Sequence, residues 1–244
     1  MRFLGKYFNF VYLMFVNKES FKTYLKLIID ELVVIGVDSV VITCIISVAM
    51  GAVTSIQIAS NMSLGGPMVP DYIVGLAVRN MTILELSPTL LSVVFAGKIG
   101  SSIASQLSSM RISEQIDALE IMGINTISYL VLPKVIASVL SYPLLITISS
   151  FLSIYSGYIA GIYVSQIPPE DYIKGVTMLF RTSDINLAIC KSLSFGFLVS
   201  TISAYNGFFV YGGALAVGKA STKAVTYSCI AILIADYLII RLFL

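Results

Sequence analysis

The sequence contains no histidine and no tryptophan, and it has only three cysteines among its 244 residues. The missing imidazoles exclude histidine-based acid–base catalysis and histidine ligands for a metal ion. Cys44, Cys190 and Cys229 lie far apart in apolar runs and show no CxxC spacing, so they predict neither a disulfide framework nor a metal site. Without tryptophan, an aromatic belt at a membrane surface has to be built from tyrosine.

Charged side chains are also scarce. They make up 11% of the residues, whereas hydrophobic residues make up 57% and the mean hydropathy is +0.94. Soluble domains carry about 25% charged residues, because a chain of this size still has to cover its surface with polar groups. We therefore predict an all-α integral membrane protein. The formal net charge of +2 is too small to indicate a nucleic-acid partner.

Five apolar stretches are long enough to cross a bilayer, which takes about 20 residues of helix. Pro88 in the second stretch and Pro143 in the third predict kinks. Gly65-Gly66-Pro67 predicts a turn after the first stretch, and the polar residues 170–186 predict a loop with a short helix. The five spans are expected within residues 39–70, 72–108, 135–169, 192–218 and about 224–243.

Residues 1–32 interleave aromatic and basic side chains, and no window in this segment is long and apolar enough to span a membrane. No small-residue cleavage site follows an apolar segment, so a signal peptide is not predicted. We expect residues 1–32 to form a basic, aromatic-rich helix in the membrane interface. Residues 33–244 are then expected to form a single transmembrane domain.

The distribution of basic residues predicts the orientation, because Lys and Arg collect in cytoplasmic loops. With the N-terminus inside, the segments 1–32, 98–134 and 219–223 place ten Lys and Arg in the cytoplasm, in groups of five, three and two. The segments left outside carry four, and Lys191 falls at or within the fourth span. The N-terminus and the segment between the second and third spans are therefore predicted to be cytoplasmic.

That segment has the pattern of a short amphipathic helix over about 112–124. Ser113 is placed to cap its N-terminus, acids follow in the first turn, where they suit the helix dipole, and Gly123 is expected to stop the helix. Apolar residues recur on one face of this helix. It is either an ordinary solvated loop helix or a docking helix for a soluble partner. Its polar residues are Glu114, Gln115, Asp117 and Glu120.

Glu85, Lys191 and Asp236 fall in or near the apolar runs of three different spans. An ionisable group at bilayer depth is costly, so such groups usually pair with one another or line a wet cavity. The three residues either form a structural ion pair that serves only helix packing, such as Lys191 with Glu85 or with Asp236, or belong to a substrate path. For a substrate path we expect Glu85 and Lys191 to lie within ion-pair reach. Gln57 in the first span is a weaker candidate, because a single amide often makes just an interhelical hydrogen bond.

The stretch from Gly213 to Ala220 nearly matches the phosphate-binding pattern GxxxxGK[ST]. Ala220 stands where that loop needs a Ser or Thr for Mg²⁺, and no strand–loop–helix context surrounds it. We therefore interpret these glycines as part of a tight turn at the membrane edge, with Lys219 and Lys223 on the cytoplasmic side.

Several of these stretches resemble the MlaE/YrbE family, the permease subunits of ABC systems that transport lipids together with MCE-domain proteins. FAGKIGSSIA, MRISEQIDALEIMGI and YLVLPK, all within 95–134, carry the resemblance. LELSP at 84–88 is similar to the RELGP segment of the family, and YNGFFVYGGALAVGKASTKAVTYS at 205–228, followed by Asp236, is similar to its C-terminal signature. The chain departs from the family pattern at Leu84, at Asn125-Thr126 and at Ala216, where the family has Arg, Asp-Pro and Gly.

The resemblance implies a homodimeric permease in the bacterial inner membrane, with an N-terminal interfacial helix and five spans in each subunit. Two cytoplasmic ATPase subunits would lie below it and a ring of MCE-domain subunits above it. The cargo would be phospholipid moved between the inner and outer membranes. The chain itself would bind no cofactor and hydrolyse no ATP, so it is not expected to be an enzyme.

The resemblance also implies roles for individual residues. The coupling helix of the family maps onto Glu114–Gly123, and its intramembrane acid, lysine and aspartate map onto Glu85, Lys191 and Asp236. Because Leu84 replaces an Arg, Glu85 loses a neighbouring partner and a partner on another helix becomes more important. We expect the first and fifth spans to line the lipid tails, with Ile58, Met62 and Leu233 in contact with them. That list of contact residues is a hypothesis.

Two other function classes compete with an ABC permease. A proton-coupled secondary transporter of an amphipathic substrate could work through Glu85 and Asp236, but the sequence lacks paired broken-helix repeats and the acidic cytoplasmic helix would have no role. An intramembrane enzyme would need a nucleophile and a base at recognisable spacing, and none is found.

Overall fold

The computed structural model describes residues 2–16, 21–63 and 70–243, and these residues form helices and no strand. Three short π-helical segments, η1 to η3, interrupt the α-helices. In chain order the elements are α1 (Arg2–Met14), α2 (Phe21–Leu32), η1 (Val33–Val37), α3 (Asp38–Ser63), α4 (Tyr72–Met81), η2 (Thr82–Leu90), α5 (Leu91–Phe95), η3 (Ala96–Gly100), α6 (Ser101–Ile112), α7 (Gln115–Ile121), α8 (Thr126–Tyr163), α9 (Pro169–Thr177), α10 (Thr182–Phe208) and α11 (Ala214–Phe243).

Within these described residues, five continuous helices are long and apolar enough to cross a membrane, which confirms the predicted all-α membrane fold. These helices are longer than a bilayer crossing requires. The 38 residues of α8 extend about 57 Å at 1.5 Å per residue, against a hydrocarbon core of about 30 Å. The long helices therefore tilt or continue beyond the membrane. They cover Tyr24–Met62, Tyr72–Ile112, Thr126–Tyr163, Thr182–Phe208 and Ala214–Phe243.

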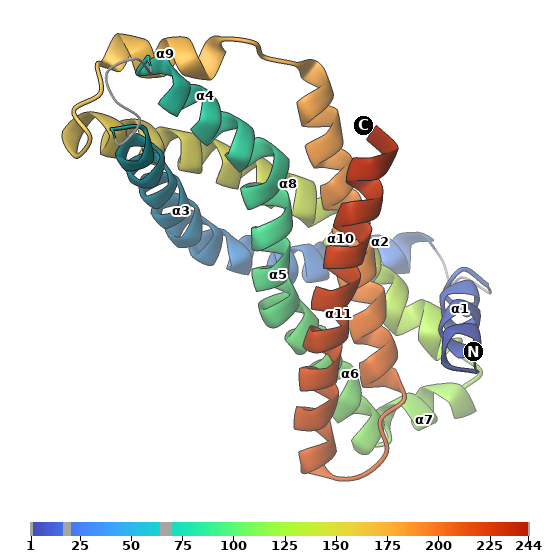
Figure 1. Cartoon of the computed structure of the whole chain (residues 1–244). Coiled ribbons are helices and arrows are strands. Elements are labelled where there is room, and N and C mark those ends of the chain that lie inside the picture. The colour runs from blue at the N-terminus through green and yellow to red at the C-terminus, as the bar shows by residue number, and fades with distance from the viewer. Residues whose placement is uncertain (1, 17–20, 64–69, 244) are drawn as a thin grey trace.

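The first long helix begins before the expected span. Helix α2 continues through η1 into α3 without a break, and the chain changes direction where they join (Figure 1). Helix α2 itself ends at Leu32, but η1 follows it without a gap, so the boundary expected for the interfacial segment at residue 32 stays a prediction. The turn expected at Gly65-Gly66-Pro67 lies outside the described residues.

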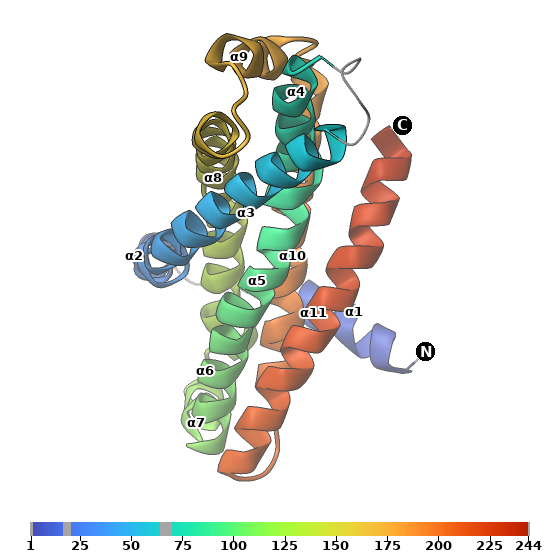
Figure 2. The same cartoon turned by 60° about the vertical axis from the view of Figure 1, so that its left-hand side comes forward.

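The bundle has two ends, and successive long helices run toward one end and back toward the other. Helix α7 and the α10–α11 connection lie at one end, and α9 lies beside the start of α4 at the other (Figures 1 and 2). We call these the α7 end and the α9 end. Helix α10 runs from the α9 end to the α7 end, and α11 runs back (Figure 2).

Small side chains bring α3 and α8 close together. The Ser47 hydroxyl donates to the Ser149 hydroxyl at 2.7 Å, and the Ser153 hydroxyl donates to the Ser47 carbonyl at 2.9 Å. A Cβ atom on Gly51 would lie 1.9 Å from the Ser153 carbonyl oxygen, so only glycine fits there. Such small-residue contacts are how membrane helices approach without a hydrophobic driving force.

Helix α1 packs against the α7 half of the bundle. The Tyr7 and Thr201 hydroxyls are 2.7 Å apart, and Phe10 is buried with its ring centroid 5.6 Å from that of Tyr205. Burial raises the pKa of the Tyr7 phenol above its ordinary value, so this phenol stays neutral at physiological pH. Two aromatic rings of α1, Phe8 and Tyr12, point away from the bundle and are exposed. This arrangement fits a helix lying in a membrane interface.

Candidate functional site

Three charged side chains from three elements meet inside the bundle. The Lys191 ammonium on α10 lies 2.7 Å from a carboxylate oxygen of Asp236 on α11 and 3.0 Å from one of Glu85 on η2. The Lys191 side chain is fully buried, whereas 14% of the Asp236 side chain and 46% of the Glu85 side chain are exposed. The expected approach of Lys191 and Glu85 is confirmed. Asp236 completes the group as the nearer partner, and we call these three residues the ion cluster.

The local backbone explains how the ion cluster holds an ammonium at this depth. Pro88 has no N–H to offer the Leu84 carbonyl four residues earlier, as a regular helix would require. The Lys191 ammonium donates to that carbonyl at 2.8 Å. The segment around Pro88 is π-helical, as helices often are where the regular ladder is broken. The irregularity expected at Pro88 is thus present, and it provides a third oxygen for Lys191.

Thr89 adds a neutral link between the two carboxylates. Its hydroxyl lies 3.3 Å from an oxygen of Glu85 and 3.1 Å from an oxygen of Asp236. The ion cluster therefore consists of one cation and two anions with a formal charge of −1, and the Thr89 hydroxyl bridges its two carboxylates. Sequence analysis did not select Thr89. Its position one turn after Glu85 was the available signal, because residues four apart share a helix face.

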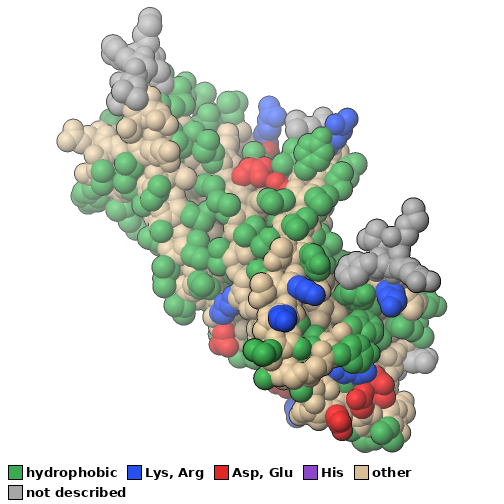
Figure 3. All heavy atoms as spheres, turned by 60° about the horizontal axis from the view of Figure 1, so that its bottom comes forward, with side chains coloured by type: hydrophobic (Ala, Val, Ile, Leu, Met, Phe, Trp, Pro, Cys, Tyr) green, Lys and Arg blue, Asp and Glu red, His purple; other side chains and the backbone are tan. Residues whose placement is uncertain are grey.

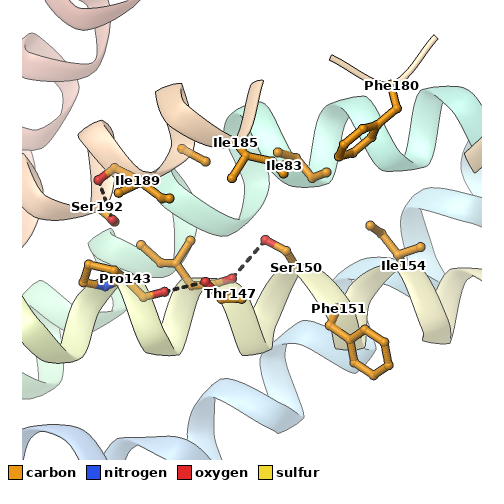
Figure 4. A pocket seen from close by; sticks show the side chains of 12 residues that line it. Ile83, Pro143, Thr147, Ser150, Phe151, Ile154, Phe180, Ile185, Ile189 and Ser192 are labelled. Carbon is orange, nitrogen blue, oxygen red and sulfur yellow. Dashed lines mark hydrogen bonds between the residues drawn. The ribbon is translucent and has the colours of Figure 1, made fainter. Parts of the chain in front are cut away.

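An apolar cavity of about 250 Å³ opens near the ion cluster, between α8, α10 and η2. Figure 4 shows its walls, in which Ile83, Ile185 and Ile189 lie on one side of the space and residues of α8, among them Pro143 and Thr147, lie on the other. Three of the hydroxyls at this cavity, those of Thr147, Ser150 and Ser192, donate to carbonyls of their own helices, so they leave the lining apolar. No residue of the ion cluster lines this cavity, although Ile83 and Ser192 in its wall lie within two residues of Glu85 and Lys191 along the chain.

The other residues expected in the cargo path lie elsewhere. Ile58 and Met62 pack against Val74, Val78 and Tyr172, in a cluster formed by α3, α4 and α9. Gln57 and Leu233 are exposed on their helices. The structure therefore does not bring these four residues to the ion cluster or to the apolar cavity, and their contact with lipid tails stays a prediction.

The short helix between the second and third spans is present as α7, with two corrections. Ser113 does not cap it, because its hydroxyl donates to the Ser109 carbonyl at 2.8 Å and the residue ends α6. The residue before α7 is Glu114, which has the left-handed backbone angle φ = 59° and makes no capping hydrogen bond. Gly123 follows the helix with φ = 80°, as expected of a glycine that stops a helix.

The side chains of α7 divide between the bundle and the outside. Ile116 is fully buried, whereas 87% of Ile121 and 72% of Met122 are exposed. Asp117 lies 2.7 Å from the Arg111 guanidinium and Glu120 lies 3.6 Å from it, so two of the predicted docking acids are held by α6. The exposed residues of α7 and its two caps that form no ion pair within the described part of the chain include Glu114, Gln115, Ala118, Ile121 and Met122.

The GxxxxGK stretch forms no phosphate-binding loop. Helix α11 begins at Ala214, so Gly218 and Lys219 lie within a helix whose backbone N–H groups bond along the helix. The turn expected over this stretch is confined to its start, because Gly212, with φ = 125°, and Gly213 precede α11, whereas Gly218 is helical. Across the described ranges, no group of three or more metal-ligating side chains lies close enough to hold an ion.

The comparisons with known proteins agree with this architecture. The family model of the permease MlaE matches residues 28–242. A probable ABC transporter permease of Rickettsia prowazekii is 36% identical over 220 residues, which cover 90% of this chain and 84% of the relative. A probable ABC transporter permease of Synechocystis is 32% identical over 209 residues, covering 86% of this chain and 78% of the relative.

A plant protein matches a shorter part. The chloroplast protein TRIGALACTOSYLDIACYLGLYCEROL 1 of Arabidopsis thaliana is 37% identical over 159 residues, covering 65% of this chain and 45% of that protein. Together with the five long apolar helices, these matches identify a multi-pass membrane permease of the ABC-transporter type. The chain belongs to the MlaE permease family.

Proposed function

We propose that this chain is the membrane subunit of an ABC transporter that moves phospholipid between the inner and outer membranes. Two copies would work with cytoplasmic ATPase subunits and a periplasmic MCE-domain protein, and the N-terminus would be cytoplasmic in a bacterial inner membrane. The observation that carries the proposal is the fully buried Lys191, which is held by two carboxylates and lies on a helix that also forms a wall of an apolar cavity. A phospholipid needs both surroundings, because its phosphate is charged and its tails are apolar.

The geometry suggests which contact can open. Glu85 is nearly half exposed on the single chain, so it can move away from Lys191 into a water-filled space between two subunits, where its carboxylate would stay hydrated. Asp236 is mostly buried, and releasing it would cost more desolvation free energy. A lipid phosphate that approached Lys191 would therefore displace Glu85 first. The cation would then exchange one anion for another and would not be left unpaired.

Helix α11 supports the proposal of a homodimer. Its outward side exposes a row of large apolar residues on the same helix as Asp236. In a membrane this side faces either lipid or a second copy, and a second copy would place two ion clusters near a shared space. The exposed residues are Ile230, Leu233, Ile234, Tyr237 and Leu238.

The names of the relatives support two further parts of the proposal. Relatives called ABC transporter permeases imply a separate ATPase subunit, for which α7 offers exposed residues at one end of the bundle. The Arabidopsis relative is named after a glycolipid, trigalactosyldiacylglycerol, which supports a lipid cargo.

Transfer of fluorescent phospholipid by the reconstituted complex tests the role of the ion cluster. We expect Lys191→Ala to lower the transfer rate by about tenfold or more, because it removes the cation that would bind the lipid phosphate, and a hydrogen bond to a charged group contributes about 1.5–3 kcal/mol. Lys191→Arg keeps the charge and should retain part of the rate. Both variants should copurify with the ATPase at the native ratio, because the change lies in the cargo path and not at the α7 end.

A variant of the ion cluster without charges distinguishes a role in lipid transport from a role in helix packing. The triple variant Glu85→Gln, Lys191→Met, Asp236→Asn removes every charge and leaves no unpaired ion, so the fold should tolerate it. If the charges act on cargo, this variant inserts normally but does not transfer lipid. A normal transfer rate in the triple variant would show that the ion cluster serves only helix packing. Absence of a copurifying ATPase from the native protein would favour a proton-coupled transporter instead.

A further inference from the structure

A second cavity, of about 450 Å³, lies at the α7 end between the close of α10 and the start of α11. It is lined by both polar and apolar side chains, and we call it the basic groove. Lys219 and Lys223 are four residues apart, so they share one face of α11. The lining residues are Tyr205, Asn206, Phe209, Val210, Tyr211, Ala216, Lys219, Ala220 and Lys223.

The charge of the basic groove favours an anion. It is lined by two ammonium groups and no carboxylate. In the part of the chain that the structure describes, neither Lys219 nor Lys223 has an ion-pair partner. Figure 3, which looks toward the α7 end, shows Lys and Arg side chains near the middle of this face without acidic side chains beside them. The nearby acids of α7 are engaged elsewhere, since Asp117 pairs with Arg111.

The neighbours of the basic groove place it at the level of a membrane surface. Two of its lining rings also contact α1, with ring centroids 5.7 Å apart in both the Tyr7–Tyr205 and the Phe10–Phe209 pairs. On its other side α1 exposes Phe8 and Tyr12. Aromatic rings gather where the hydrocarbon of a bilayer meets the headgroups, and a cation beside them lies within reach of lipid phosphates.

We propose that the basic groove binds the phosphate of a phospholipid in the cytoplasmic leaflet, with Lys219 and Lys223 as its ligands. Phe209, Val210 and Ala216 give the apolar part of the lining on which a glycerol backbone can rest. A soluble nucleotide suits this site less well, because α11 is already helical through Gly218 and offers no loop to wrap a phosphate chain. One part of this inference rests on the proposed function. The choice of the cytoplasmic leaflet assumes that the α7 end of the bundle faces the cytoplasm.

The basic groove is also connected to α7. The Arg111 guanidinium, which pairs with Asp117, lies 6.0 Å from the centre of the Tyr211 ring at the rim of the groove. It lies 5.8 Å from the Phe208 ring on α10 as well. A displacement of α7 would therefore move a residue that lines the groove. A headgroup held there is in a position to be released or captured when a partner moves α7.

A single tryptophan can report binding, because the chain has none of its own. Tyr211 is exposed and lies at the groove, so Tyr211→Trp introduces the probe without filling a packed site. The complex purified with its ATPase is titrated with dihexanoylphosphatidylglycerol while the tryptophan emission is recorded. Dihexanoylglycerol, which lacks the phosphate, and inorganic phosphate, which lacks the glycerol and tails, are titrated in parallel.

We expect a saturable change with the phospholipid, none with dihexanoylglycerol, and at least tenfold weaker binding of inorganic phosphate. Lys219→Ala with Lys223→Ala should weaken phospholipid binding on the order of tenfold. Each basic residue near a membrane surface accounts for about half of this loss or more, on a logarithmic scale of affinity. Lys219→Arg with Lys223→Arg should retain binding. The matched control, Lys26→Ala with Lys174→Ala, loses the same charge away from the groove and should also retain it.

Other outcomes would overturn the inference. If inorganic phosphate bound as tightly as the phospholipid, the site would be assigned to a soluble anion. If dihexanoylglycerol bound as tightly as the phospholipid, the phosphate would not be the group that the site recognises. The absence of any saturable change would show that the basic groove is closed or covered in the complex. None of these results alters ATPase copurification or the effect of Lys191→Ala, so failure here is distinguishable from failure of the proposed function.

Discussion

Lys134 is a second buried ammonium, and sequence analysis did not select it as a functional residue. Only 4% of its side chain is exposed. Its ammonium pairs with Glu31 of α2 and lies 2.6 Å from the side-chain oxygen of Gln106 on α6. Lys134 itself belongs to α8, so one cation joins three helices near the α7 half of the bundle. Its position directly after Pro133 in a long apolar helix was the available signal.

We predict that Lys134→Met lowers the stability of the purified protein by about 2–3 kcal/mol. This is less than the 3–5 kcal/mol typical of a fully buried pair, because the Glu31 side chain left behind is 20% exposed and gains some hydration. Thermal unfolding in detergent should show a midpoint lower by about 5 °C or more. Glu31→Gln with Lys134→Met removes both charges and should recover most of the loss. An equal loss in the double variant would assign the effect to packing and not to the ion pair.

At single positions, the pairing of buried charged side chains was easier to predict than the residues that line a cavity. Glu85 and Lys191 were expected to meet because a lone charge at bilayer depth is too costly, and this argument requires no knowledge of the fold. The apolar cavity was not predicted, because α8 and α10 are apolar around most of their circumference and no periodicity marks the inner side. Ser113 was misassigned for a local reason. A serine at a helix end can bond forward as a cap or back to the preceding turn, and here it bonds back.

Among the elements, α7 has the clearest external surface. Its acids were expected to dock with a partner, but Arg111 already holds Asp117 and Glu120. Reversing the charge of Asp117 would therefore damage the permease as well as any interface. The exposed Ile121 and Met122 offer a better test, because adjacent apolar side chains with such high exposure often mark a contact with another protein.

We predict that Ile121→Ser with Met122→Ser reduces ATPase binding on the order of tenfold without lowering the thermal stability of the permease. Loss of apolar anchors from an interface weakens association, and residues this exposed contribute little to the fold. The ratio of ATPase to permease after affinity purification measures the effect. Val164→Ser with Leu179→Ser removes comparable exposed residues outside α7 and should leave the ratio unchanged. A native ratio in the α7 variant would exclude these residues as anchors.

The existence of each span was predictable from apolar length alone, whereas the helix ends were not. Helix α2 joins α3 through a π-helical turn, and a run such as Val33–Val37 carries neither a Gly–Pro turn nor a charge that would show the junction. The second span contains two further π-helical segments around Pro88 and Gly97. Such turns satisfy backbone hydrogen bonds within a helix, so they leave little trace in the sequence.

At the scale of the whole molecule, the two ends differ in what they present. The α7 end carries the exposed tip of α7, the basic groove and the adjoining aromatic helix α1. Near the α9 end Arg79 is buried, and its guanidinium donates to the carbonyls of Val176 and Met178 at 2.8 and 2.7 Å. That cation therefore holds a loop in place at the α9 end, and the orientation predicted from Lys and Arg stays a prediction.

The orientation itself can be measured with cysteine labelling. Gln115 on α7 and Ser183 on α10 are both exposed and lie at opposite ends of the bundle. In a variant whose three cysteines are replaced by alanine, we predict that a membrane-impermeable maleimide added to intact cells labels Ser183→Cys and not Gln115→Cys. Permeabilised cells should label both, which controls for reactivity. The reverse pattern would put α7 outside, where no ATP-hydrolysing partner could reach it, and would contradict both the coupling role of α7 and the assignment of the basic groove to the cytoplasmic leaflet.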